Sequence, residues 1–384
     1  MAGPDEAAVL DQRRGLLDLT LTTRDKGKVD AVPMCGVPHH AARGYVAKLT
    51  DLGHKVVICE QVEDPKLAKG LVRRDVVRIV TPGVVVDEDA LDPRVGRYVA
   101  ALVPGDLAAP TPPGKGRRAA PAAPTEPGWG LAYLDVTTGE FRATELGTAA
   151  AAVDELARIG PREVIVAGEL LGPGGAASPG APIRRFAAVW GSAPVPDLDR
   201  ASAELTAALA EPIADLARAR PSLVRAAAAV LAYARATQPG GTLPIARLAV
   251  YEPGATMVLD EAAIANLELC ASLVGGKRTG SLLEVLDETA TSPGARLLRR
   301  WLLYPLTDLT AIAARADAVT ELFTAGELRR ELRQQLRTTS DLERLAGKAT
   351  LGVAGPRDLG RVRDTLVALP ALAALAAPAP RLDG

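Results

Sequence analysis

The stretch that decides the fold runs from Pro33 to Gly83 and reads PMCGVPHHAARGYVAKLTDLGHKVVICEQVEDPKLAKGLVRRDVVRIVTPG. Apolar residues recur at helical spacing between Tyr45 and Leu52 and predict a short helix that ends at Gly53. Short apolar runs predict two strands, at 56–59 and 76–80. The stretch therefore predicts a small mixed α/β unit.

A run of basic residues lies between the two predicted strands, after a helix start predicted at Asp64 and Pro65. From residue 66 to 78, five basic side chains accompany one acid, and they are Lys66, Lys69, Arg73, Arg74 and Arg78. Such clusters are typical of surfaces that face nucleic-acid phosphates, and a solvated charged face is the alternative. We treat the run as a candidate phosphate-binding arm, although strand alternation can turn Arg78 inward.

Three segments of the stretch carry a family resemblance, namely PMCGVPHHA at 33–41, ICEQ at 58–61 and RIVTPG at 78–83. In this order they resemble the mismatch-recognition domain of the MutS family of DNA mismatch repair proteins. The resemblance implies contact with duplex DNA in or beside the minor groove. The candidate residues of the loop for that contact are Met34, Val37, Pro38 and His39.

The family pattern also contains a Gly-Asp-Phe-Tyr-Glu segment, whose phenylalanine wedges into the minor groove at the mispair and whose glutamate binds the displaced base. In this chain Met1 to Asp5 stand at those positions, and the first phenylalanine is Phe141. Kinking a duplex costs a few kcal/mol per unstacked step, which an apolar wedge offsets. We therefore expect the chain to contact DNA without strong selectivity for mismatches.

An acidic connector, 84–93, separates a first domain predicted at 1–90 from a second at 91–240. The first domain is predicted to begin with a helix at 6–17 and a strand at 19–22. The second is predicted to contain strands at 98–103, 130–136, 141–146 and 163–167 and helices at 149–159 and 221–236. A Pro/Gly-rich insert, 104–128, is expected to be disordered.

The segment GLAYLDVTTGEF at 130–141 resembles the family's connector domain, which implies a ribonuclease H-like fold. That fold is also found in nucleases, but fold alone does not establish function. Asp135 and Glu140 are the only carboxylates close together here, and two-metal catalysis needs a larger cluster. We expect this pair to have a structural role in the turn.

Helical periodicity dominates the third predicted domain, 241–384. Four helices are predicted, at 260–273, 292–303, 308–323 and 327–336. In the second of these, an apolar stripe is formed by Leu297, Leu298, Trp301 and Leu302. Arg296, Arg299 and Arg300 fall largely outside the stripe and are expected to be solvated. Runs such as RLLRRWL at 296–302 resemble the start of the family's helical core, so the fold class is multidomain α/β plus all-α.

Composition limits the other possibilities. The 384 residues suffice for two or three domains, and 45 basic against 46 acidic residues require any nucleic-acid affinity to come from local clusters. Cys35, Cys59 and Cys270 are odd in number and set in apolar surroundings, which predicts structural thiols in a reducing cytoplasm. With neither a secretory signal nor an apolar run of ~20 residues visible, we expect a bacterial cytoplasmic, nucleoid-associated protein without membrane contact.

The chain shows no G-x-x-x-x-G-K-[ST] pattern, so we expect no nucleotide site, no cofactor and no catalytic residue in it. The resemblance places ATP and Mg²⁺ in a C-terminal ATPase domain of the family that this chain does not include. His39 and His40 lack neighbours at ligand spacing, so we expect no metal site.

Our leading hypothesis is the N-terminal portion of a MutS-like protein that contacts mismatched duplex DNA. For whole family members the resemblance implies homodimers, ATP-driven switching and recruitment of MutL, and it leaves the oligomeric state of this chain open. A protein-interaction module, or a non-functional fragment with negligible DNA binding, is the alternative. The sequence leaves open whether Met1 and Gly384 are natural ends.

Overall fold

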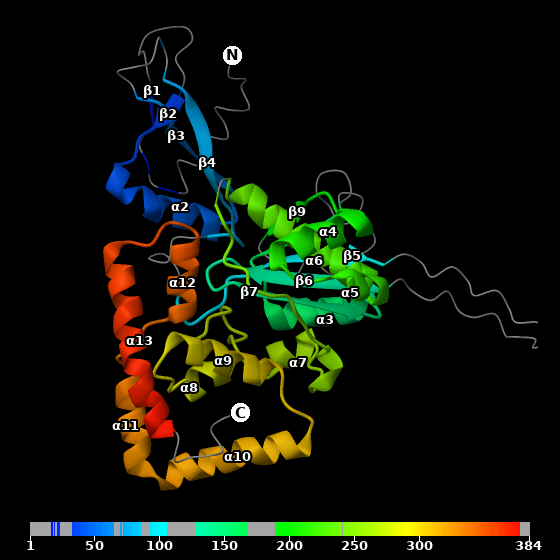
Figure 1. Ribbon diagram of the computed structural model, residues 1–384, viewed down its shortest axis with the longest axis vertical. Coiled ribbons are helices and arrows are strands. Elements are labelled where there is room, and N and C mark those ends of the chain that lie inside the picture. The colour runs from blue at the N-terminus through cyan, green and yellow to red at the C-terminus, as the bar shows by residue number, and fades with distance from the viewer. Residues whose placement is uncertain are drawn as a thin grey trace, which may run out of the picture.

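The computed structural model describes residues 17, 19, 21–23, 33–64, 70, 72–85, 92–105, 128–167, 189–239 and 241–376. They form a small α/β part at the N-terminus, a central six-stranded sheet covered by helices, and a C-terminal helical part (Figure 1). The predicted mixture of α/β and helical structure is confirmed. Most of the predicted helix 6–17, most of the insert 104–128 and the residues Lys66 and Lys69 lie outside the described residues.

The N-terminal α/β part consists of two separate antiparallel hairpins and a helix between them in the chain. Its elements are β1 (Leu21–Thr23), β2 (Pro33–Cys35), η1 (His39–Ala41), α2 (Ala42–Asp51), β3 (Val56–Gln61) and β4 (Arg74–Val80). Gly53 has a φ of 89°, a left-handed conformation that suits glycine and ends α2 as predicted. The helix and both strands predicted in this stretch are confirmed.

The central sheet has the strand order β10-β7-β6-β5-β8-β9. Its strands are β5 (Val99–Pro104), β6 (Trp129–Asp135), β7 (Glu140–Leu146), β8 (Glu163–Val166), β9 (Val189–Ser192) and β10 (Ala249–Val250). The β5, β6 and β7 strands are antiparallel, whereas β8 pairs parallel with β5 and β9 with β8. Across four strands, one row of paired residues contains Glu163, Val99, Leu134 and Phe141.

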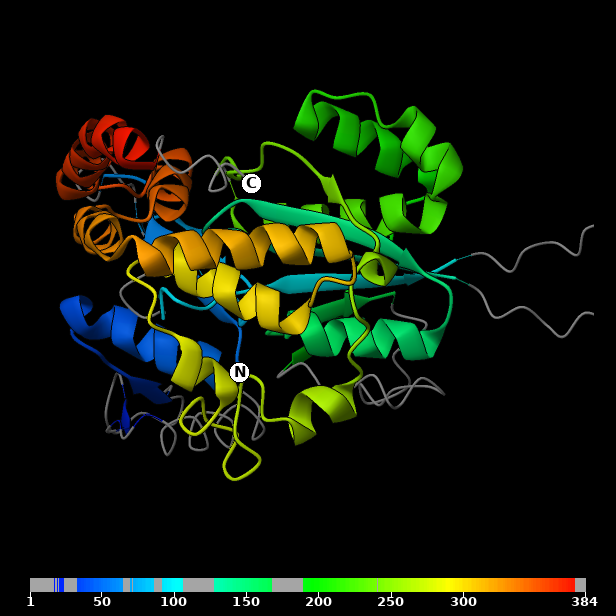
Figure 2. The ribbon, with the colours of Figure 1, turned by 90° about the horizontal axis from the view of Figure 1, so that it is seen from below.

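Helices cover both faces of this sheet (Figure 2). On one face lies α3 (Ala149–Ile159), which begins where the Thr148 side chain accepts a hydrogen bond from the Ala151 N–H and ends at left-handed Gly160, as predicted. On the other face lie α4 (Leu198–Leu209), α5 (Ala214–Ala219) and α6 (Pro221–Thr237). Six consecutive residues of α6, 226–231, are at most 2% exposed, because the small alanines let this helix approach the sheet closely.

The close approach of α6 depends on Gly130 in β6. A Cβ at this position would overlap the backbone carbonyl of Ser222, the second residue of α6. We therefore expect Gly130→Ala to lower the free energy of unfolding by about 1–3 kcal/mol, the usual cost of overpacking. Urea unfolding followed by tryptophan fluorescence measures this, with Gly147→Ala as the matched control, since nothing lies within 4 Å of a Cβ there. Equal midpoints for the two variants would contradict the prediction.

The C-terminal part is helical from α7 onward, after the short η6 (Pro253–Ala255). Its helices are α7 (Glu261–Asn266), α8 (Leu282–Leu286), α9 (Ser292–Leu303), α10 (Leu309–Thr324), α11 (Gly326–Leu336), α12 (Leu342–Thr350) and α13 (Pro356–Ala376). The predictions for α9, α10 and α11 are confirmed to within one residue at each end. Among the described helices, none combines the length and apolar character that a membrane span requires.

The predicted helix 260–273 is wrong in its second half. The helix ends at Asn266, and Glu268 adopts a left-handed φ of 49°. The backbone groups of this segment pair elsewhere, because the carbonyls of Glu268 and Leu269 accept hydrogen bonds from the N–H groups of Leu282 and Leu283. The apolar spacing could not reveal that the chain folds back on itself here.

The predicted orientation of α9 is also wrong. Leu297 and Trp301 of the apolar stripe are 44% and 39% exposed, and Trp301 instead stacks with the guanidinium of Arg315, 3.8 Å from its ring centre. The side chain of Arg296 is only 9% exposed. The polar face of α9 packs inward because carboxylates of the sheet and of α12 are there to pair with its arginines.

Candidate nucleic-acid interface

Strand β2 and the loop after it present apolar side chains to solvent. Met34 and Val37 are 42% and 38% exposed, and Pro38 and His39 are exposed as well. Pro38 precedes η1, and its carbonyl accepts a hydrogen bond of 2.9 Å from the Ala41 N–H. The turn therefore fixes the backbone of the loop, and the side chains named above stay exposed to solvent.

The described residues of the basic arm lie at and before the start of β4. Arg73 and Arg74 are exposed, and Arg78, opposite Ile58 in the hairpin, is half-buried. The Glu63 carboxylate accepts a 2.6 Å hydrogen bond from the backbone N–H of Arg73. Within the described ranges, no carboxylate lies within ion-pairing distance of the three guanidinium groups. The placement of Lys66 and Lys69 stays a prediction.

The N-terminal part is joined to the sheet through Glu163, the first residue of β8, which is fully buried. One carboxylate oxygen pairs with Lys55 at 3.0 Å and accepts a 2.5 Å hydrogen bond from Tyr233. The other accepts hydrogen bonds from the Thr81 hydroxyl (2.6 Å) and the Gly83 N–H (3.3 Å). Nothing in the sequence around Glu163 predicts that this single acidic residue connects the N-terminal part to the sheet.

Burial and the charge of Glu163 raise the pKa of Tyr233 to about 12. Burial by itself would lower the pKa of Lys55, but the Tyr233 hydroxyl and the Glu163 charge raise it above its usual value. Both shifts favour the protonated forms that donate to Glu163, so the joint is held by a protonated tyrosine and a charged lysine.

A second tie uses Arg97, which is 8% exposed and lies just before β5. Its Nε donates a 2.7 Å hydrogen bond to the carbonyl of Pro82, and its Nη2 lies 3.2 Å from Asp51 at the end of α2. Burial lowers the pKa of this guanidinium and the charge of Asp51 opposes the shift. The arginine thus links the N-terminal part to the sheet at the edge where Glu163 lies.

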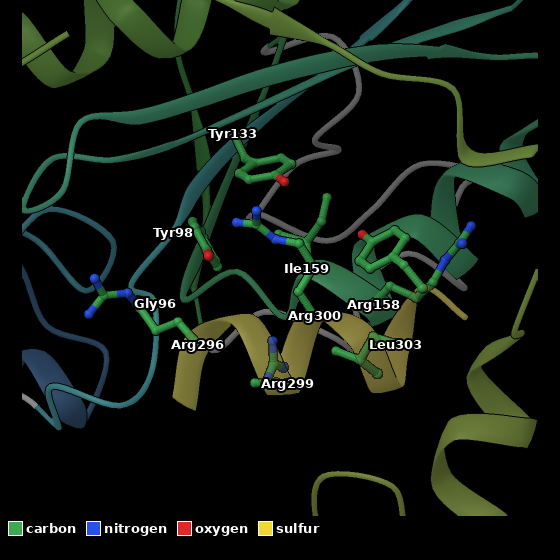
Figure 3. A pocket seen from close by; sticks show the side chains of 10 residues that line it. Gly96, Tyr98, Tyr133, Arg158, Ile159, Arg296, Arg299, Arg300 and Leu303 are labelled. Carbon is green, nitrogen blue, oxygen red and sulfur yellow. The ribbon is translucent and has the colours of Figure 1, made fainter. Parts of the chain in front are cut away.

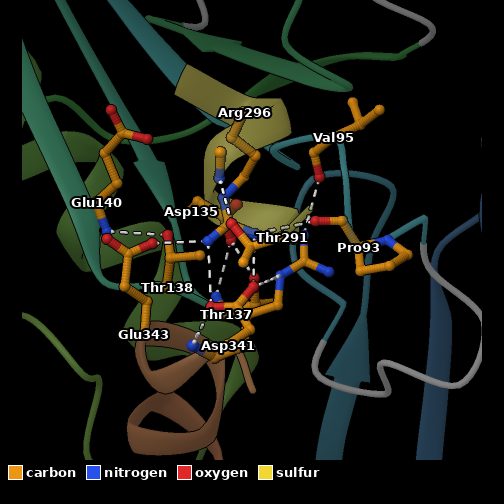
Figure 4. A network of polar contacts seen from close by, with 12 residues as sticks. Pro93, Val95, Asp135, Thr137, Thr138, Glu140, Thr291, Arg296, Asp341 and Glu343 are labelled. Carbon is orange, nitrogen blue, oxygen red and sulfur yellow. Dashed lines mark hydrogen bonds and ion pairs between the residues drawn. The ribbon is translucent and has the colours of Figure 1, made fainter. Parts of the chain in front are cut away.

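The pair Asp135 and Glu140 has structural contacts (Figure 4). Asp135 is 1% exposed, and it accepts hydrogen bonds from the N–H and hydroxyl of Thr137, at 2.8 and 2.6 Å, and from the Arg97 N–H at 2.9 Å. Glu140 accepts a 3.0 Å hydrogen bond from Tyr98 and pairs with Arg300 of α9. The expected role in the turn is confirmed, with an added role in holding α9.

The same sheet edge meets α12 (Figure 4). Arg296 of α9 donates to the carbonyl of Pro93 at 2.9 Å and to the carboxylates of Asp341 and Glu343 at 2.6 and 2.7 Å. A Cβ at Gly347 of α12 would overlap the carbonyl of Thr137 in the β6–β7 turn. The helical part is therefore packed directly on the turn.

A buried polar cluster joins α3 to the helical part. Glu155 is 0% exposed; it accepts hydrogen bonds from Tyr251 (2.7 Å) and Tyr304 (2.8 Å), and its other oxygen lies 2.7 Å from Nη2 of Arg158. Arg158 is 2% exposed and stacks on the Tyr304 ring, 5.0 Å from its centre. Burial and the charge of Glu155 raise the pKa values of both tyrosines well above their usual value.

The cysteines only partly fit the prediction. Cys35 and Cys270 are partly buried and Cys59 is exposed, so the apolar surroundings expected for Cys59 are wrong; a strand of this open hairpin has one face in solvent. His39 and His40 are exposed in η1. The part of the chain that the structure describes contains no group of three or more His, Cys, Asp or Glu residues arranged to hold a metal ion.

Comparison with known proteins identifies the family. Residues 7–89 match the family model of MutS domain I, residues 119–245 that of MutS domain II and residues 262–383 that of MutS domain III. The chain belongs to the MutS family. The exposed loop and arm lie in the segment that matches MutS domain I. Strands β6 to β9 of the six-stranded sheet and helices α3 to α6 lie in the segment that matches MutS domain II.

Curated members of the MutS family resemble the chain along nearly its whole length. The DNA mismatch repair protein MutS of Sorangium cellulosum is 46% identical over 98% of the chain and 40% of its own length. Those of an Anaeromyxobacter species and of Myxococcus xanthus are 42% and 40% identical over 94% of the chain, and 38% of their own length is covered. The chain thus spans about 40% of the length of these relatives.

Proposed function

We propose that the chain is the DNA-contacting N-terminal portion of a bacterial mismatch repair protein, and that it binds duplex DNA through its N-terminal part. Membership of the MutS family supports this, as does the name DNA mismatch repair protein that its relatives bear. The observation that carries the proposal is the exposed pair Arg73 and Arg74, with no carboxylate partner among the described residues, in the part that also exposes Met34 and Val37.

Each candidate residue has a role in this proposal. Arg73 and Arg74, together with Lys66 and Lys69, bind phosphates and set the position of the protein on the duplex. Met34, Val37 and Pro38 lie against sugar edges in or beside the minor groove, and His39 supplies a hydrogen-bonding group there. Arg78, half-buried in strand β4, contributes mainly to the local potential.

For the connector we propose a ribonuclease H-like fold without nuclease activity. The strand order supports the fold, because three antiparallel strands are followed at one side by two parallel ones. The absence of activity is supported by Asp135 and Glu140, whose carboxylates are already bound to Thr137, Tyr98 and Arg300.

For the whole protein we propose a cytoplasmic, nucleoid-associated homodimer that binds mispairs. It changes conformation with ATP and Mg²⁺ bound outside this chain, and it recruits a MutL-type partner. We also propose the division into domains 1–90, 91–240 and 241–384. Family resemblance supports both proposals.

Removing the two exposed arginines of the arm tests the DNA-binding proposal. With Arg73→Ala/Arg74→Ala, we expect duplex affinity to fall about tenfold or more and the slope of log K against log salt to become shallower by about 2, one for each lost phosphate contact. Fluorescence anisotropy at several salt concentrations measures both. The control is Arg218→Ala, an exposed arginine on α5. Wild-type affinity and slope in the double variant would refute the arm and favour a protein-interaction module.

Selectivity is tested on a G·T duplex and its matched duplex at one salt concentration. We expect the two affinities to differ by less than about tenfold, because the chain has no Phe-x-Glu wedge to offset the few kcal/mol of unstacking. A larger preference for the mismatch would contradict this expectation.

A further inference from the structure

A cavity of about 250 Å³ lies where the sheet's helix α3 meets α9 of the helical part. Its wall contains Arg162 and Arg299, the backbone of Gly96 and Gly160, and apolar side chains. A smaller space of about 20 Å³ adjoins it through Gly96, Ile159 and Arg299, and Figure 3 shows the arginines and tyrosines that line that space. Because a water molecule takes about 30 Å³ of liquid, the larger cavity has room for a small ion with part of its hydration shell.

The charges around the cavity do not balance. Three neighbouring arginines are neutralised: Arg158 by Glu155, Arg296 by Asp341 and Glu343, and Arg300 by Glu140. Among the described residues, no carboxylate lies within ion-pairing distance of Arg162 or Arg299. The Cys270 thiol beside Arg299 is neutral, since burial raises its pKa although the arginine opposes that shift. The cavity therefore has two unneutralised cations, one from each side.

Two glycines of the cavity wall have close neighbours. A Cβ at Gly160 would stand 3.3 Å from Nη2 of Arg299, so glycine allows the guanidinium to lie over the end of α3. A Cβ at Gly96 would overlap the ring of Tyr98. At the end of α3, Arg299 meets only the partial negative charge of the helix carbonyls. The N–H of Gly160 donates its hydrogen bond to the carbonyl of Leu156.

We propose that this cavity binds a phosphate-class oxyanion, held between the guanidinium groups of Arg162 and Arg299. A guanidinium presents parallel N–H donors that match two oxygens of such an anion, and two of them balance its charge at neutral pH. The bound anion bridges the sheet to α9 and replaces repulsion between two cations by two charge-assisted contacts. Inorganic phosphate and the terminal phosphate of a phosphomonoester share this chemistry.

The test uses the 384-residue chain at constant ionic strength, titrated calorimetrically with inorganic phosphate and, separately, with adenosine monophosphate. We expect saturable binding of phosphate, weakened about tenfold or more by Arg162→Gln and by Arg299→Gln. Arg218→Gln is the control that should bind as the wild type does, and Arg73→Ala/Arg74→Ala tests separately whether phosphate binds the basic arm instead. Arg162 is exposed, so its substitution leaves the fold intact and keeps the test valid if Arg299→Gln misfolds.

The outcomes separate cleanly. Phosphate binding that depends on Arg162 supports the site, and equal binding of the monophosphate identifies a phosphomonoester as an accepted ligand. Absence of saturation below about 10 mM phosphate, or wild-type affinity in Arg162→Gln, overturns the proposal. Loss of phosphate binding in Arg73→Ala/Arg74→Ala would also overturn it, by placing the anion on the DNA-binding arm.

Discussion

Glu155→Ala is expected to lower the free energy of unfolding by about 3–5 kcal/mol, because it leaves the buried charge of Arg158 without its partner. The hydroxyls of Tyr251 and Tyr304 lose their acceptor in the same step. Glu155→Gln keeps an oxygen for both tyrosines and removes only the charge, so it should be milder than alanine.

Chemical unfolding followed by tryptophan fluorescence measures this loss, since Trp129 and Trp190 pack beside the core that α3 completes. The matched control is Asp215→Ala, which removes the acid of a solvent-exposed pair with Arg218 and should leave the midpoint unchanged. A midpoint for Glu155→Ala equal to that of the control would mean that the cluster contributes no net stability.

Glu163→Ala is expected to weaken the attachment of the N-terminal part to the sheet. It should lower the free energy of unfolding by about 2–4 kcal/mol, because three donors lose a charged acceptor. The contribution of Lys55 is the smaller one, since its side chain is 41% exposed and solvent screens the pair. Hydrogen exchange of 56–61 and 74–85 should accelerate, while exchange in β6 should change little. Uniform protection in both regions would exclude Glu163 as the joint.

The same joint predicts a dependence on alkaline pH. The pKa of Tyr233 is raised to about 12 in the folded state from about 10 in the unfolded chain, so its contribution is complete below pH ~10 and is lost between pH ~10 and ~12. The raised pKa of Lys55 acts in the same direction. Glu163→Gln removes the charge that stabilises both protonated forms and should flatten this part of the stability profile. An unchanged profile would show that the tyrosines of the Glu155 cluster dominate it.

Local signals predicted the regular elements well. Thr148 and Gly160 mark both ends of α3, and the apolar runs of β3 to β8 show their strands, because caps and alternation act over a few residues. The failures are long-range. The polar face of α9 packs inward only because Glu140 and Asp341, distant in the chain, are there to meet it.

The candidate site was predictable to a similar degree. Arg73, Arg74, Met34 and Val37 are exposed because they lie in loops or in the short strands beside them. The joint at Glu163 was not predictable, because its partners come from α2's end, β4's end and α6 and meet only in the fold. An acidic residue in an apolar strand is recognisable in the sequence as unusual, but the sequence does not show which residues contact it in the fold.

The row of paired residues that runs from Glu163 through Val99 and Leu134 to Phe141 has a mechanical consequence. Glu163, at one end of the row, pairs with Lys55 of the N-terminal part, and Glu140, next to the other end, pairs with Arg300 of the helical part. Three strand spacings separate the ends, about 14 Å in all. A displacement of the N-terminal part is therefore expected to reach the helical part through the hydrogen bonds of four strands, with side-chain contacts at both ends.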